Sequence, residues 1–137
     1  MTFVVDASVV LKWVLPESQR DEALAILDQF ESEQIDLIAP GVLTHEVASA
    51  LAKRVRQRLI SPDAAQRGWE VFNLRQPVLI EGPELTRAAF ALSLEHHLSY
   101  WDCLYLALAI TQRCELITAD CRFHRGAFQH YPNMRLL

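Results

Sequence analysis

The sequence predicts an α/β fold in which a parallel β-sheet of about five strands lies between two layers of helices, a three-layer α/β/α sandwich. Short apolar runs of strand length alternate with segments of helix length along the whole chain. This alternation is typical of a parallel sheet that helices cover on both faces. The chain has 137 residues, of which 51% are hydrophobic. That length and composition suit one compact domain over residues 1–137.

The first half of the chain contains two predicted strands. Its expected elements, in order, are a strand at Thr2–Val5, helices at Ala7–Leu15 and Ser18–Glu33, a strand at Asp36–Ala39, and a helix at Val42–Leu59. Pro16 ends the first helix because proline lacks an N–H group and disfavours the helical conformation in the residue before it. Apolar residues at helical spacing support the second helix.

The second half contains three predicted strands. Its expected elements are a helix that opens at Ser61-Pro62-Asp63, a strand at Pro77–Ile80, a helix from Pro83 to about Leu98, an apolar helix after Ser99, a strand at Glu115–Thr118, a helical or turn-rich segment at Asp120–His130, and a short strand at Met134–Leu136. Serine can cap a helix and proline suits its first turn. The aromatic residues Trp13, Tyr100, Trp101 and Tyr105 lie in apolar runs, which predicts that they belong to the core. Stacking of a base on Trp101 is the alternative, and nothing in the sequence indicates it.

Charge and cysteine content narrow the class of protein. The formal net charge is −4, which excludes a nucleic-acid binder held by bulk positive charge, so any such contact needs a local basic patch. The three cysteines form no CxxC pair, which favours reduced thiols. The chain shows no signal-peptide pattern and no apolar run long enough to span a bilayer. We therefore expect a cytoplasmic protein without a membrane partner.

Two aspartates follow predicted strands. Asp6 comes directly after the first strand, and Asp120 follows the Glu115–Thr118 strand. Taken singly, each is explained by helix capping, because aspartate is a preferred N-cap residue. The carboxyl ends of parallel strands share one edge of a sheet, however, and such sheets bind ligands beyond that edge.

Two further acids lie on predicted helices. Glu46 shares the apolar face of its helix with Leu43 and Ala50. A buried carboxylate is costly unless it is paired or binds a metal. Asp102 can form a capping box with Ser99, although the helix that follows is apolar nearly all round. We therefore expect the first turn of that helix to open into a cleft.

The four acids together predict a metal site. Asp6, Glu46, Asp102 and Asp120 are all expected near one edge of the sheet, where their negative charges would repel one another. Oxygen ligands of this kind favour hard cations such as Mg²⁺ or Mn²⁺. The spacing of the histidines and cysteines fits no standard zinc site.

The chain resembles the PIN-domain family, and in particular the VapC-type toxin ribonucleases of prokaryotic toxin–antitoxin pairs. The resemblance rests on four segments in order: VVDASVVLKWVL, HEVASALAKR, YWDCLYLALA and ITADCRF. It implies that Asp6, Glu46, Asp102 and Asp120 are the catalytic, metal-binding acids. It also implies supporting roles for Ser8 and Thr118. One position departs from many relatives, because Ser49 stands where they carry asparagine.

The resemblance implies a function and partners. It implies an endoribonuclease that needs Mg²⁺ or Mn²⁺ and leaves 5′-phosphate and 3′-hydroxyl ends on RNA, with tRNA or rRNA among the substrates of such toxins. It also implies a homodimer that an antitoxin holds inactive. Exposed apolar positions on Ser18–Phe30 and Val42–Leu59 are candidate docking surfaces for that antitoxin.

Basic residues near the acids are candidates for RNA binding. Lys12, Arg54 and Arg58, together with Lys53 and Arg56, lie on the helices that follow Asp6 and carry Glu46. A solvated helix face explains the same pattern. Two other functions fit the sequence less well. A PIN-like module that binds RNA or protein without catalysis would be expected to lose one of the acids. A phosphotransfer enzyme with an aspartate nucleophile would need a second acid at position 8 or a late lysine, and the chain has neither.

Overall fold

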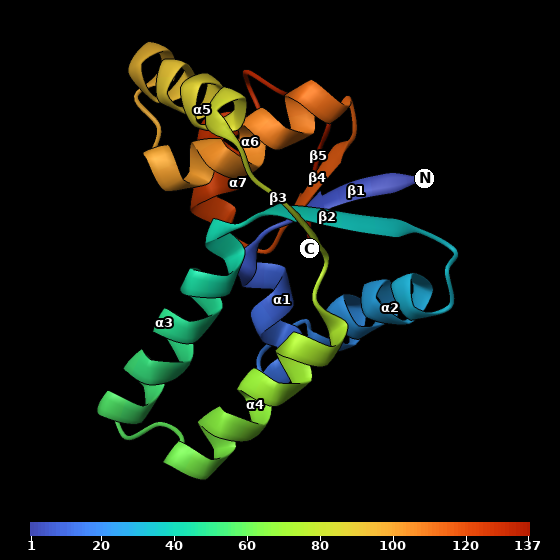
Figure 1. Ribbon diagram of the computed structural model, residues 1–137, viewed down its shortest axis with the longest axis vertical. Helices are drawn as coiled ribbons and strands as arrows, with labels where there is room; N and C mark the ends of the chain where they lie inside the picture. The colour runs from blue at the N-terminus through green and yellow to red at the C-terminus, as the bar shows by residue number, and fades with distance from the viewer.

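A computed structural model describes all residues, 1–137, and confirms the predicted sandwich (Figure 1). Its five strands run parallel in the order β3-β2-β1-β4-β5. The strands are β1 (Thr2–Val5), β2 (Asp36–Pro40), β3 (Val78–Ile80), β4 (Glu115–Thr118) and β5 (Met134–Leu136). The predicted fifth strand is therefore present. Because β1 lies between β2 and β4, the order of strands reverses beside it, which is where parallel sheets usually bind ligands.

Seven helices complete the fold. They are α1 (Ala7–Val14), α2 (Arg20–Glu31), α3 (Val42–Arg56), α4 (Pro62–Arg75), α5 (Pro83–His96), α6 (Tyr100–Gln112) and α7 (Cys121–Ala127). The helices α1 and α2 pack together on one face of the sheet, and α5 and α6 pack together on the other (Figure 1). α3 and α4 form a hairpin that extends beyond the sheet and contacts α1. No helix is long and apolar enough to cross a membrane.

The core surrounds β1 and α6. Val4 and Val5 of β1 are fully buried, and so are Leu116 and Ile117 of β4 beside them. α6 is buried over the whole stretch from residue 103 to residue 109, as its apolar composition predicts. A helix with so wide an apolar surface is stable only inside the protein. The first turn of α6 therefore lies where the core meets the carboxyl edge of the sheet.

Several helix ends differ from the predicted ones by a few residues. α3 ends at Arg56 instead of Leu59, and Arg58 beyond it has a left-handed backbone with a φ of 58°. α2 begins at Arg20 instead of Ser18, because Gln19 is also left-handed, with a φ of 60°. Such conformations interrupt a right-handed helix. At α4 the prediction is confirmed in detail: Ser61 Oγ accepts a hydrogen bond from the Ala64 N–H, and Pro62 occupies the first turn.

One expectation for the start of α6 is wrong, and the alternative explanation of Asp102 as part of a capping box is excluded. Trp101 is 58% exposed and does not belong to the core, although Trp13 and Tyr105 do. Ser99 precedes α6 but makes no side-chain capping bond, so the predicted capping box with Asp102 does not form. The exposure of Trp101 follows from where the core begins. The apolar run begins at Tyr100, but the buried part of α6 begins only at Cys103. The first turn of α6 therefore projects out of the core.

A partly buried group of charged residues connects α3 to α1 and to the loop that follows α1. Glu17, in the loop after α1, accepts a hydrogen bond from Arg54 of α3 and lies 3.6 Å from Lys12 of α1. Lys12 is only 7% exposed, and its Nζ also donates to the Ser18 carbonyl at 2.8 Å. One carboxylate therefore offsets two cations that come from two helices.

Removing that carboxylate should destabilise the protein. We predict that Glu17→Ala lowers the free energy of unfolding by about 1–2 kcal/mol, because the buried Lys12 ammonium would lose its counter-charge. The matched control is Glu31→Ala, since Glu31 pairs with Arg75 where both side chains are about half exposed. An exposed pair contributes at most about 1 kcal/mol. Urea unfolding measures both variants, and equal losses would contradict this account of Glu17.

Candidate metal centre

Asp6 lies between the first strand and the first helix and is almost completely buried. Its side chain caps α1: Oδ1 accepts hydrogen bonds from the N–H of Ser8 at 3.0 Å and of Val9 at 3.4 Å. Only 6% of the residue is exposed. The capping interpretation of Asp6 is thus confirmed, but a capping residue has no need of such deep burial. The remaining contacts of its carboxylate indicate a second role.

Two hydroxyl groups hold Asp6 from the neighbouring strand and helix. Ser8 Oγ donates to Oδ1 of Asp6, and Thr118 Oγ1, at the end of β4, donates to Oδ2. Ser8 Oγ also accepts from the Ala119 N–H at 2.8 Å, and Thr118 Oγ1 accepts from the Asp120 N–H at 3.0 Å. The two hydroxyls therefore tie the end of β1 to the end of β4, which fixes the turn that carries Asp120.

Glu46 is held by a tyrosine of α6. The hydroxyl of Tyr105 donates to Oε1 of Glu46 at 2.7 Å. Tyr105 is only 2% exposed and lies one helical turn after Asp102. Sequence reasoning assigned Tyr105 to the core and missed this contact. The spacing of three residues from Asp102 is the signal that would have placed its ring on the same face of the helix.

Asp102 and Asp120 are more accessible. Asp102 is half-buried in the first turn of α6. Asp120 is exposed, and its Oδ1 caps α7 by accepting from the N–H of Arg122 at 2.9 Å and of Phe123 at 3.1 Å. None of the four acids forms an ion pair with a Lys, Arg or His side chain.

Burial raises the pKa of three of these carboxyls, and repulsion from other acids adds to the rise at Asp6 and Asp102. Burial raises the pKa of Asp6 to about 6, despite the hydroxyls of Ser8 and Thr118 that favour the charged form, and the charge of Glu46 adds to the rise. The pKa of Asp102 is also raised to about 6, first by burial and then by the charges of Asp120 and Glu46. Burial raises the pKa of Glu46, while the hydrogen bond from Tyr105 opposes the change. The four acids therefore interact electrostatically, as their sequence positions predict.

The chemistry of this group fits a hard divalent cation. All four donors are carboxylates without a compensating cation in the chain, and oxygen ligands of this kind suit Mg²⁺ or Mn²⁺. No three His, Cys, Asp or Glu side chains converge closely enough to enclose an ion by themselves. A divalent ion at these acids would therefore need water molecules or substrate oxygens to complete its coordination.

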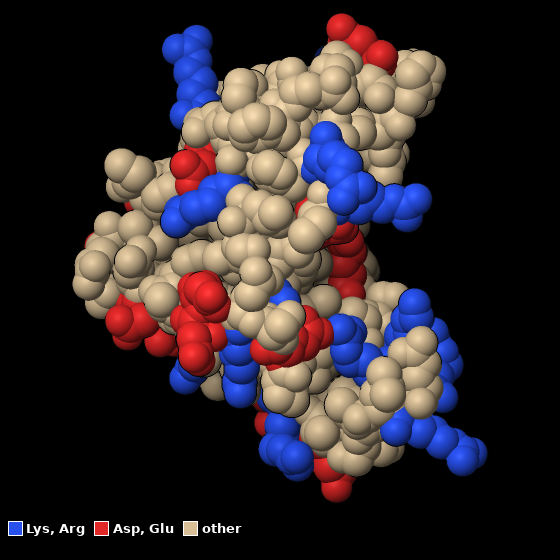
Figure 2. All heavy atoms as spheres, turned by 180° about the vertical axis from the view of Figure 1, so that it is seen from behind, with Lys and Arg blue, Asp and Glu red and all other residues tan.

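A hollow opens beside the acids, between α3 and the start of α6. Its volume is about 670 Å³, and Glu46 and Asp102 both line it. Figure 2 shows that face of the molecule: red carboxylate atoms lie in a hollow, and blue Lys and Arg side chains gather on both sides of it. Among the predicted RNA-binding residues, Lys12 and Arg54 are engaged by Glu17, whereas Lys53 and Arg58 are exposed and form no ion pair. Lys53 also lines the hollow.

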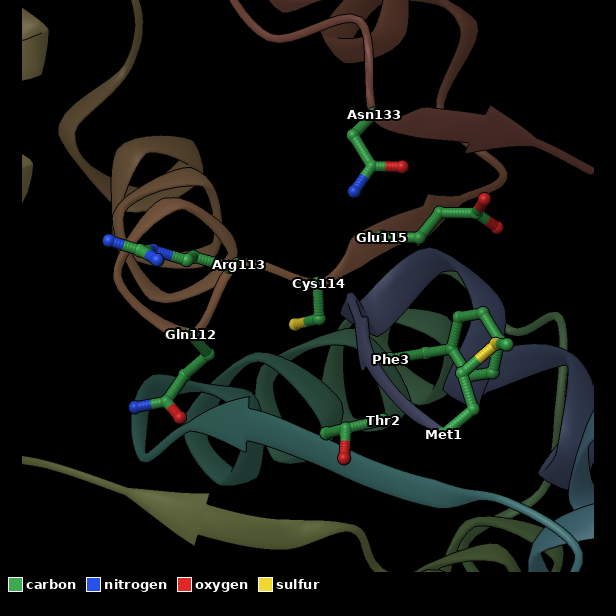
Figure 3. A pocket seen from close by; sticks show the side chains of 8 residues that line it. All are labelled: Met1, Thr2, Phe3, Gln112, Arg113, Cys114, Glu115 and Asn133. Atoms are coloured by element: carbon green, nitrogen blue, oxygen red, sulfur yellow. The ribbon is translucent and has the colours of Figure 1, made fainter.

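The opposite edge of the sheet carries no comparable chemistry. A hollow of about 420 Å³ lies there, at the amino ends of β1 and β4 (Figure 3). Its one acid, Glu115, accepts a hydrogen bond from Arg135 at 2.7 Å and is therefore neutralised. Figure 3 shows the side chain of Arg113 pointing away from Glu115. The reactive groups of the protein are thus concentrated at the carboxyl edge.

Comparison with known proteins agrees with this geometry. Residues 3–129 match the family model of the PIN domain. Ribonuclease VapC3 from Pyrobaculum aerophilum is 33% identical over 125 residues, which are 88% of this chain and 90% of that protein. The chain therefore belongs to the PIN-domain family, among its VapC-type members.

Two solved structures share the fold at low sequence identity. VapBC2 from Rickettsia felis, bound to a DNA fragment of its promoter, is 15% identical, with a TM-score of 0.69 over 100% of this chain and 98% of that one. VapC20 from Mycobacterium tuberculosis, described as a toxin that cleaves the sarcin–ricin loop, is 17% identical, with a TM-score of 0.64 over 90% and 94%. At this identity the likeness extends to the fold alone.

The raised pKa of Asp102 predicts how stability depends on pH in the absence of metal. The pKa of the Asp102 carboxyl rises on folding, from 3.8 to about 6. Its protonated form therefore stabilises the folded state relative to its charged form. Its contribution is therefore present below pH 4 and is lost as the pH rises through 6. We predict that Asp102→Asn matches the wild type near pH 4 and is more stable by about 1 kcal/mol at pH 8, after allowance for solvent screening of a partly exposed group.

Denaturant unfolding in EDTA, repeated across this pH range, measures the difference. Asp36→Asn is the matched control, since Asp36 is an exposed acid at the amino end of β2. A variant of Asp102 that is less stable than the wild type at pH 8 would contradict the uncompensated charge.

The contact between Tyr105 and Glu46 predicts a coupling energy. We expect Tyr105→Phe to lower the free energy of unfolding and to do so by about 1 kcal/mol less when Glu46 is already Ala, because the hydrogen bond is then absent in both states. Tyr100→Phe is the control, since the ring of Tyr100 lies on the same helix but packs against Trp101. A double-mutant cycle by urea unfolding gives the coupling, and a value near zero would rule out this contact.

Proposed function

We propose that the protein is a metal-dependent endoribonuclease and the toxin of a toxin–antitoxin pair, acting in the cytoplasm. The observation that carries the proposal is the set of four carboxylates, all present, at the ligand-binding edge of a PIN-domain sheet. Membership of the VapC-type proteins supports it, because the curated relative is a ribonuclease by name. We assign Mg²⁺ or Mn²⁺ as the cofactor on the chemistry of the oxygen donors.

The roles of the acids follow from their contacts. Asp6 and Asp102 are the best placed to ligate the ion, because Asp6 is rigidly held and Asp102 lines the hollow beside it. Glu46 and Asp120 would add negative charge around the ion, and the hydrogen bond from Tyr105 would orient Glu46. Ser8 and Thr118 would keep Asp6 ionised and oriented. A bound divalent ion would supply a more acidic water molecule and offset the charge that develops on the phosphate.

Basic residues on two sides of the acids would hold the RNA backbone. α3 contributes Lys53 and Arg56, and the turn after it contributes Arg58, all exposed. α7 begins beside Asp120 and carries Arg122 and Arg125, which are also exposed and form no ion pair. Contacts to phosphate contribute affinity without reading sequence. Arg54 and Lys12 are weaker candidates than the sequence indicated, since Glu17 already engages both.

An antitoxin is the second proposed partner, and a homodimer the proposed assembly. The VapBC2 structure named above supports the first, since it is a complex of that kind by name. α3 and α4 offer a hollow of about 410 Å³ with apolar side chains such as Leu51, Val55 and Trp69, which is a candidate docking surface on the predicted Val42–Leu59 segment. Size-exclusion chromatography with light scattering, with and without an antitoxin, tests both.

The decisive experiment on function compares metals and variants. The chain is purified free of any partner and incubated with total cellular RNA in Mg²⁺, in Mn²⁺ or in EDTA. We expect discrete cleavage that needs the metal and falls by on the order of a hundredfold or more in Asp102→Asn, because the metal contributes several kcal/mol to transition-state stabilisation. Asp36→Asn is the control and should cleave like the wild type.

A readout independent of cleavage accompanies it. Mg²⁺ should raise the melting temperature of the wild type and of Asp36→Asn but not of Asp102→Asn, because a ligand that binds only the folded state stabilises it. A folded protein that binds Mg²⁺ and RNA but cuts no RNA would favour the alternative, a non-catalytic PIN-like module that holds RNA or protein. Cleavage that persists in EDTA would overturn the proposal.

A further inference from the structure

We propose that the hollow between α3 and the start of α6 binds a nucleobase of single-stranded RNA, with the indole ring of Trp101 as the stacking surface. This inference rests on the proposed function and adds to it a base-binding subsite beside the metal centre. The subsite would bind the base of the nucleotide next to the phosphate that is cut. Three observations support this inference: the exposure of Trp101 beside the acids, the contact of its ring with Tyr100, and the composition of the hollow.

The exposure of Trp101 is unusual for its position in the sequence. Trp101 is 58% exposed although it lies in the first turn of α6, the most deeply buried helix of the protein, next to Asp102. Indole rings contribute strongly to stability when they are buried, so an exposed one beside a candidate active site gives up that contribution. The other two tryptophans follow the usual pattern, since Trp13 is buried and Trp69 is half-buried.

One aromatic neighbour contacts the ring of Trp101. Tyr100 packs against it edge-on, with ring centroids 5.3 Å apart and planes at 74°. Tyr100 itself packs against the small apolar cluster formed by Ala89, Cys103, Leu104 and Ala107. An aromatic surface that is already oriented loses little entropy when a ligand stacks on it. The contact with Tyr100 restricts the ring of Trp101, and its exposed face remains free for a base to stack on it.

The hollow joins this platform to the acids. Trp101, Asp102 and Glu46 all line it, so a base on the indole would lie beside the metal centre. His45, Ser49 and Lys53 of α3 line the same hollow and offer hydrogen bonds and one positive charge. Bases of single-stranded RNA are recognised in this way, by stacking on aromatic rings and by hydrogen bonds to their edges. The volume of about 670 Å³ accommodates a nucleotide.

The composition of the hollow favours RNA over a protein segment. Its lining combines apolar surface, on which a base can lie, with side chains that can hydrogen-bond to the edge of the base, such as those of His45 and Ser49. Lys53 forms no ion pair and can contact a phosphate. The exposed apolar residues Phe90 and Leu94 lie on α5, and neither lines the hollow. Trp101 is thus the exposed aromatic residue that the fold places at the acids.

The test measures RNA binding and cleavage separately. Short homopolymeric oligoribonucleotides are titrated into the full-length protein in EDTA, and steady-state cleavage is measured in Mg²⁺. The test variants are Trp101→Leu and Trp101→Phe. The matched control is Phe90→Leu, which replaces an aromatic side chain of the same exposure, 57%, on α5. Indole fluorescence reports stacking directly, since Trp101 is the most exposed of the three tryptophans.

We expect Trp101→Leu to weaken RNA binding on the order of tenfold and to raise KM similarly with kcat nearly unchanged, as removal of one stacked base does. Trp101→Phe should keep part of the affinity. RNA should quench the fluorescence of the wild type and of Phe90→Leu but not of Trp101→Leu. The rise in melting temperature that Mg²⁺ produces should be the same in all of them, because the carboxylates are unchanged.

Three results would overturn the subsite. If Trp101→Leu binds and cuts RNA like the wild type, the subsite is wrong while the proposed nuclease function stands. If Trp101→Leu keeps its affinity for RNA and loses affinity for an antitoxin peptide, the hollow belongs to the protein partner. If the wild type neither binds nor cuts single-stranded RNA, the subsite and the proposed function fall together.

Discussion

The hydrogen bonds to the buried carboxylate of Asp6 are the interaction on which the rest of the site depends. A carboxylate at 6% exposure would be strongly destabilising without partners. Ser8 and Thr118 supply them from α1 and β4, and the same hydroxyls accept from the backbone N–H groups of Ala119 and Asp120. The network therefore joins the two strand ends at the reversal of strand order, and it sets where Asp120 can lie relative to Asp6.

The four acids repel one another, and no Lys, Arg or His side chain forms an ion pair that offsets this repulsion. Asp102 and Glu46 add negative charge on helices whose interior positions are rigidly packed, and their pKa values are raised. Two basic residues, Lys12 and Arg54, lie on the helices that begin at Asp6 and carry Glu46. Glu17 engages both, so neither forms an ion pair with the acids. Functional sites often destabilise the folded protein when they are empty. A ligand that binds only the folded state would restore this stability.

The sequence predicts the architecture and the acid set well because both depend on local patterns. Alternating apolar runs identify all five strands, and strand ends in a parallel sheet must share an edge, so Asp6 and Asp120 are placed without knowledge of contacts. The failures concern relations that no local pattern encodes. Trp101 belongs to an apolar run that extends beyond the core. The pairing of Arg54 with Glu17 joins residues 37 positions apart. Tyr105 is buried as predicted, yet its hydroxyl reaches Glu46 on another helix. Composition indicates that a side chain is buried or charged, but only packing decides what it meets.

The central claim is that these carboxylates gather to hold a divalent cation, and diffraction from crystals soaked in Mn²⁺ tests it most directly. Manganese can be located by its anomalous signal without reference to enzymatic activity. The account predicts an anomalous peak in contact with carboxylate oxygens of Asp6 and Asp102, which disappears in crystals of Asp102→Asn. Crystals saturated with Mn²⁺ that show no peak at these residues, while Asp6 keeps its contacts with Ser8 and Thr118, would contradict it.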